Sequence, residues 1–170
     1  MDPVPNLISW CARTSLGKPR HSSQKAYARP AVNLMDFDWL LVLAIALYEK
    51  GDYSLTTSLL ERALRIRPKD AVACSSLAWL HFQRANFARA ASIWRSCLGV
   101  APDESQALCG LGLCHLELND LGQAVARFTD AVRLDPNNPL SWRLLAQTHR
   151  RFGETRQACE CLSRATELGG

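Results

Sequence analysis

No apolar stretch of this sequence is long enough to span a lipid bilayer. The longest, residues 39–48, has ten residues, whereas a transmembrane helix needs about 20. Residues 7–11 are too short for the apolar region of a signal peptide, and no positively charged segment precedes them. The sequence therefore predicts no membrane insertion and a cytoplasmic location.

Groups that catalyse reactions or hold cofactors are also missing. The sequence has no nucleophile with a base beside it, no glycine-rich phosphate loop and no paired acidic site. Most of the seven cysteines fall at helix packing positions, and neither Cys109 with Cys114 nor Cys159 with Cys161 has zinc-site spacing on a helix. We expect no catalytic residue, no metal, no cofactor, and reduced thiols that pack as small apolar groups.

Excess charge of one sign is confined to the start of the chain. Residues 1–34 hold five Lys or Arg residues and one Asp, which leaves 15 basic and 15 acidic residues in 35–170. A region of zero net charge has no overall basic field to draw it onto nucleic acid. We therefore expect a protein or peptide partner and no nucleic acid; binding of nucleic acid through the leader and the arginines of the last repeat is the weaker alternative.

The sequence does contain a period of 34 residues. Pro68, Pro102 and Pro136 stand 34 residues apart, and the residues between them repeat in step. A unit of this length is two antiparallel helices that bury their apolar face against the next unit. The sequence predicts an all-α solenoid of four repeats (37–70, 71–104, 105–138 and 139–170) after an irregular, extended or disordered leader at 1–36. Met35 is an alternative start of translation.

Helix-start signals agree with these repeats. Asn138 followed by Pro139 predicts an N-cap with proline at the first helical position. Asp70 can cap the helix after it. Asp103 with Gln106 three residues later has the spacing of a capping box.

The turn inside each repeat needs a left-handed residue to end the first helix. Gly51, Asn119 and Gly153 stand at that position in three of the repeats. In the second repeat the position holds Ala85, which departs from the rule, so we expect the neighbouring Asn86 to take the turn instead.

Three histidines follow the same period. His81, His115 and His149 are 34 residues apart. Equivalent positions on successive repeats lie about 8–10 Å apart, which is too far for one zinc ion with bonds of about 2.0–2.1 Å. We expect each histidine to pack between the two helices of its repeat.

The recurring residues identify a family resemblance. In the third repeat they are Leu108, Leu111, Gly112, His115, Ala124, Phe128, Ala131 and Pro136. This resembles the tetratricopeptide repeat pattern of Trp, Leu-Gly, Tyr, Ala, an aromatic residue and Pro. The resemblance covers about four fifths of the chain.

The resemblance implies a concave groove lined by the first helix of each repeat. Matching positions make the groove apolar for most of its length and basic at one end, and they lack the Lys and Asn residues with which some members hold chaperone carboxylates. Such a groove would accept a hydrophobic or amphipathic segment. The implied partner-binding residues are Leu41, Val42, Ile45, Tyr48, Trp79, Phe82, Leu113, Leu116, Arg143, Gln147 and Arg150.

A second resemblance is narrower. Residues 110–136 are similar to the central repeat of type III secretion chaperones, which are small cytoplasmic proteins that hold hydrophobic export subunits and often pair through N-terminal helices. This implies a non-catalytic adaptor or chaperone.

The first expected helix supports an alternative function. Residues 37–48 are apolar on nearly every side, and such a helix is normally buried on every side. The leader, a second copy in a homodimer, or a heterologous partner would cover it. The alternative function is a structural subunit of a multiprotein assembly, docked through this helix.

Overall fold

The computed structural model describes residues 37–68, 70–99 and 104–169. The predicted leader, Pro102 and Asp103 lie outside them. Eight helices and no strand are found in the described part, as the predicted all-α fold requires. No helix in this part is both long and apolar enough to cross a membrane. The chain divides between Leu77 and Ala78 into two compact units.

Unit 1 contains a helical hairpin and the first half of α4 (Ala71–Gln83). The hairpin is α2 (Phe37–Glu49) and α3 (Tyr53–Ile66), which pack on one another. Phe37, Leu40 and Ala44 are buried along one stripe of α2. The Arg67 guanidinium lies 4.2 Å from the centre of the Phe37 ring, so the end of α3 covers the start of α2.

The opposite face of α2 is exposed. Trp39 and Val42 are 42% and 59% exposed, and they share a face because they are three residues apart on a helix. The helix that looked apolar on every side therefore has one buried stripe and one exposed stripe.

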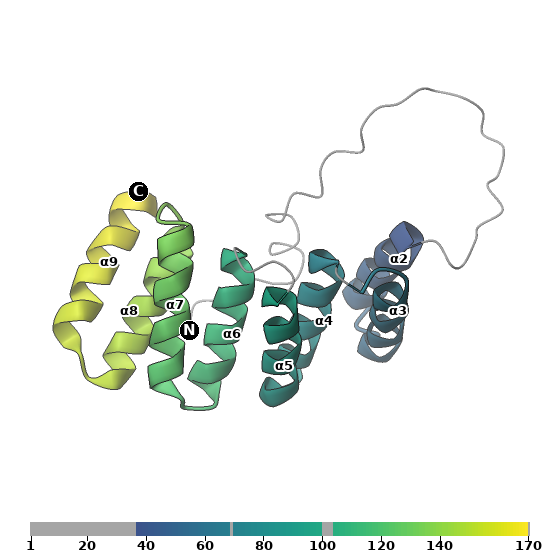
Figure 1. Ribbon diagram of the computed structural model, residues 1–170, viewed down its shortest axis with the longest axis horizontal. Helices are drawn as coiled ribbons and strands as arrows, with labels where there is room; N and C mark the ends of the chain where they lie inside the picture. The colour runs from purple at the N-terminus through teal and green to yellow at the C-terminus, as the bar shows by residue number, and fades with distance from the viewer. Residues whose placement is uncertain (1–36, 69, 100–103, 170) are drawn as a thin grey trace, which may run out of the picture. The chain divides into compact units, whose positions relative to one another are not determined.

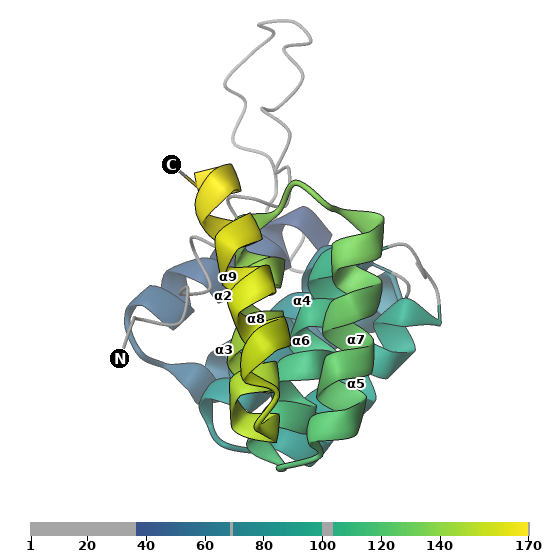
Figure 2. The same ribbon diagram turned by 90° about the vertical axis from the view of Figure 1, so that its left-hand side faces the viewer.

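Unit 2 contains the second half of α4 and five further helices packed in chain order, as Figures 1 and 2 show for α6 to α9. These helices are α5 (Phe87–Leu98), α6 (Ser105–Glu117), α7 (Leu121–Leu134), α8 (Pro139–Phe152) and α9 (Thr155–Gly169). Helix α6 contacts α5, α7 and α8 and is accordingly buried along most of its length.

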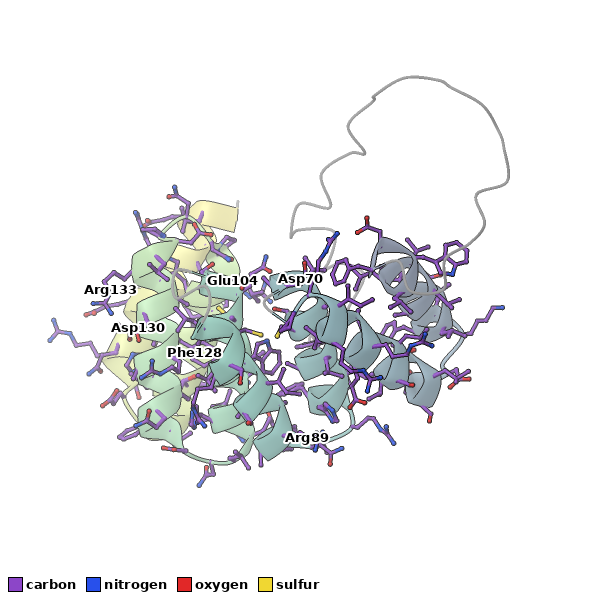
Figure 3. The ribbon with its side chains drawn as sticks, turned by 45° about the vertical axis from the view of Figure 1, so that its right-hand side comes forward. Asp70, Arg89, Glu104, Phe128, Asp130 and Arg133 are labelled. Atoms are coloured by element: carbon purple, nitrogen blue, oxygen red, sulfur yellow. The ribbon has the colours of Figure 1, made fainter. Side chains whose placement is uncertain are left out.

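The core of unit 2 depends on close approach between α6 and α7. The Phe128 side chain of α7 is fully buried and points toward α6 (Figure 3). A Cβ atom added to Gly112 of α6 would lie 2.7 Å from its ring, so the absence of a side chain at Gly112 makes room for the phenyl group. On the outer side of α7, Arg133 is bonded to Asp130 (Figure 3).

Two of the three predicted helix starts are confirmed. The Asn138 Oδ1 atom accepts a 3.0 Å hydrogen bond from the Leu140 backbone N–H, with Pro139 at the start of α8. Asp70 Oδ1 accepts from the Ala73 N–H at 2.8 Å. Helix α6 begins after Glu104, whose side chain makes no capping hydrogen bond.

The predicted left-handed turns are also confirmed, with one correction. Gly51, Asn119 and Gly153 have φ angles of 79°, 59° and 89°. The expectation for the second repeat was wrong: Ala85 itself has φ 58°, whereas Asn86 has φ −85°. The helix-ending bonds explain this, because the backbone N–H groups of residues 85 and 86 donate to Phe82 and His81 as their counterparts do in other repeats. The repeat register fixes the turn position whatever residue stands there.

Candidate protein-interaction surface

The first helices of the repeats carry all the residues predicted to bind a partner. Helix α2 carries four of them in unit 1, and α4, α6 and α8 carry seven in unit 2. Of the unit 1 residues, Val42 is exposed, and Leu41, Ile45 and Tyr48 are partly buried. The Tyr48 ring lies 5.6 Å from that of Tyr53 on α3.

The aromatic residues of α4 pack within unit 2. Trp79 is only 2% exposed because it stacks on Phe82 at 5.3 Å between ring centres and meets Trp94 of α5 edge-on at 6.4 Å. Phe82 also contacts Phe87 at 5.2 Å and keeps a partly exposed surface. Trp79 therefore has little area to offer a partner, although the sequence favoured it as an anchor.

The leucines of α6 divide in the same way. Leu116 is 1% exposed and belongs to the core of unit 2, whereas Leu113 is only partly buried at the edge of that core. A family register places both on the groove side of the helix, but only Leu113 presents surface. A binding role for any of the predicted residues stays a prediction.

Helix α8 presents the widest exposed surface among the predicted positions of unit 2. Arg143, Gln147 and Arg150 are all exposed, and their spacing of four and three residues places them on one face. The neighbouring Arg151 donates from Nη1 to the backbone carbonyl of Leu116 at 3.1 Å, which fixes the end of α8 beside the end of α6. The exposed part of the predicted surface in unit 2 is thus polar and basic, rather than mainly apolar as the sequence suggested.

Sequence reasoning missed two contacts between the histidines and the second helices. His115 Nδ1 lies 3.3 Å from Asp120 Oδ2, and His149 Nδ1 lies 2.6 Å from Glu154 Oε2. Both histidines are partly buried, as the packing role requires, and each bonds an acidic residue five positions later. The five-residue spacing was the available signal. No group of three potential metal ligands occurs in the described part of the chain.

The buried thiols are chemically quiet. Burial raises the pKa of Cys109 to about 11 and that of Cys114 to about 12. Cys109 Sγ lies 3.3 Å from Ser141 Oγ, a bond that lowers the pKa less than burial raises it. Since the thiolate is the reactive form, these cysteines act as small packing groups.

Comparison with known proteins agrees with this geometry. The tetratricopeptide repeat sequence pattern matches residues 76–139. The chain is 30% identical over 125 residues, 74% of its length, to cellulose synthase operon protein C of Pseudomonas fluorescens. It is 25% identical over 82% of its length to the general transcriptional corepressor ssn6 of Schizosaccharomyces pombe. It covers only 10% and 13% of these two proteins, so their whole activities are not assigned to it.

A solved structure supports the same fold. MamA from Desulfovibrio magneticus RS-1 superimposes with a TM-score of 0.72 and 23% identity, covering 79% of this chain and 76% of that one. At that identity the similarity shows the fold alone. The resemblance to type III secretion chaperones stays a prediction. The 34-residue register, the helical hairpins and these matches together show that this chain belongs to the tetratricopeptide repeat family, a fold that supports protein–protein interaction.

Proposed function

We propose that the protein is a non-catalytic adaptor or chaperone that holds an amphipathic segment of a partner protein on the exposed surface of α6 and α8. In its family, the first helices of successive repeats form the binding groove. The observation that supports the proposal here is the exposed stripe Arg143, Gln147 and Arg150, next to the partly buried Leu113 and Leu144. Polar groups beside apolar ones suit a segment with both kinds of side chain.

A steric block tests this proposal without changing charge. Gln147→Trp places a bulky side chain in the middle of the stripe, and Gln157→Trp places the same group at another exposed glutamine, on α9. Random twelve-residue peptides displayed on phage are selected against the full chain. We expect the enriched peptides to bind the parent and Gln157→Trp but to lose binding to Gln147→Trp. Equal binding to both variants would contradict the proposal.

A second function is favoured by a different observation. The exposed Trp39 and Val42 of α2 suit a structural subunit docked into a larger assembly through this helix, since exposed apolar stripes mark interaction sites. Native gel electrophoresis of the source-cell complex compares Val42→Asp with Leu55→Asp, another exposed apolar position of unit 1. The assembly should dissolve only with Val42→Asp. An intact assembly in that variant would exclude docking through α2.

A further inference from the structure

The charges of α8 differ from those of its neighbours. Helix α8 contains three arginines and no Asp or Glu. On α7 and α9, by contrast, arginines are bonded to carboxylates of their own helix, in the pairs Arg127–Asp130, Arg133–Asp130, Arg156–Glu160 and Arg164–Glu167. Positive charge therefore gathers on α8, although residues 35–170 have no net charge.

The carboxylates around the stripe do not offset this charge. Among the described residues, none pairs with Arg150. Glu154, the nearest acidic residue after α8, is bonded to His149. Glu117, at the end of α6, is exposed and is the one acidic group that α6 contributes. A partner with carboxylates would complete the pairing, because charge-assisted bonds to guanidinium are among the stronger hydrogen bonds.

We infer that the segment held on α8 is acidic, with two carboxylates placed to meet Arg143 and Arg150. This inference rests on the proposed function of the same surface. The two arginines are seven residues apart, which is about 10 Å along a helix axis. An extended segment spans about 10 Å in three residues, so its acidic residues should be three positions apart; a helical segment needs a spacing of seven.

A protein segment fits this surface better than a nucleic acid. The arginine stripe is a single helix face, beside the partly buried leucines 113 and 144. A nucleic-acid interface usually has a broad basic patch in a domain of high positive charge, and residues 35–170 carry none in excess. A leucine-lined border instead suits an acidic segment that also carries an apolar side chain.

The peptide selection described above also tests this inference. The enriched peptides that depend on position 147 are synthesised twice, with their own acidic residues and with Gln in their place, and binding is followed by fluorescence anisotropy. We expect these peptides to be acidic, with the three- or seven-residue spacing. Arg150→Glu should weaken their binding roughly tenfold or more, and the Gln versions should bind no better to the parent.

Arg95→Glu is the matched control, because Arg95 is also an exposed last-turn arginine, on α5. It changes the net charge equally and should leave binding within about twofold, since exposed charges beyond a Debye length are screened. Circular dichroism checks that both variants keep their helices.

The outcomes separate the inference from the proposed function. Neutral or basic peptides that depend on position 147 and bind Arg150→Glu normally would overturn the acidic partner while leaving the binding surface in place. If no peptide depends on position 147, the proposed function fails and the inference falls with it. An Arg150-dependent single-stranded oligonucleotide that binds more tightly than the peptides would replace the acidic segment with nucleic acid.

Discussion

Trp94 packs directly on the backbone of Gly110. A Cβ atom added to Gly110 would lie 2.3 Å from Cε2 of the indole, and Trp94 is 0% exposed. This contact joins α5 to α6 inside unit 2, so the closeness of the two helices depends on one missing methyl group.

Gly110→Ala should lower the free energy of unfolding by about 1–3 kcal/mol, as overpacking of a buried contact does. Gly122→Ala is the control, because nothing lies within 4 Å of a Cβ atom at that position of α7. There alanine should be neutral or stabilise by up to about 1 kcal/mol. Urea unfolding measures both, and similar midpoints for the two variants would show that the indole does not need the glycine.

Ala85→Gly should stabilise the protein by about 1 kcal/mol. The left-handed φ of Ala85 costs an L-residue with a Cβ about 1–2 kcal/mol, from which the greater backbone freedom of unfolded glycine subtracts. Ala46→Gly, at an exposed position within α2, should instead destabilise by about 0.5–1 kcal/mol. Thermal unfolding distinguishes them, and a loss of stability in both variants would argue against strain at residue 85.

Stability should fall as the pH rises above about 9. The pKa values of Cys109 and Cys114 are raised from 9.0 in the folded protein, so above pH 9 the unfolded chain loses thiol protons that the folded chain keeps. The folded state then binds more protons, and the free energy of unfolding decreases with pH, approaching about 1.4 kcal/mol per pH unit for one such thiol.

The double variant Cys109→Ala, Cys114→Ala isolates this contribution from other titrating groups. Its free energy of unfolding, measured by urea denaturation at pH 8, 9 and 10, should depend less on pH than that of the parent. Identical slopes would mean that these thiols ionise as readily in the folded protein as in the unfolded chain.

Selective alkylation provides a further test of burial. Cys159 is exposed, and Cys74, Cys97, Cys109, Cys114 and Cys161 are buried. Iodoacetamide at pH 8 should therefore modify Cys159 quickly and the buried five only after unfolding in urea. Peptide mapping by mass spectrometry reads each site. Rapid modification of Cys114 in the native protein would show that unit 2 opens readily.

The sequence predicts positions better than surroundings. The 34-residue period located the left-handed turns, because helix endings are set by local backbone bonds. It even located the turn at Ala85 more reliably than residue preference did. Asp52 and Asp120, which cap α3 and α7, follow such turns directly and could have been predicted from the same register.

Burial was harder to predict for the candidate site. The family register placed Trp79 and Gln147 at equivalent positions of α4 and α8, yet Trp79 is covered by Phe82 and Trp94 whereas Gln147 is exposed. What covers a side chain depends on the bulk of residues from neighbouring helices, which a single helix pattern does not contain. The basic character of the exposed surface emerged only after the buried aromatic and aliphatic side chains were set aside.

Photo-crosslinking at α8 tests the central claim most directly. The full chain carries Gln147→p-benzoylphenylalanine, or Gln157→p-benzoylphenylalanine as the control, and is irradiated in its source cells before the crosslinked peptides are sequenced by mass spectrometry. We predict a defined partner peptide joined at position 147 and absent at position 157, with acidic residues three or seven positions apart. Crosslinks that are equal at the two positions, or none at position 147 while α2 carries the partner, would contradict a binding surface on α8.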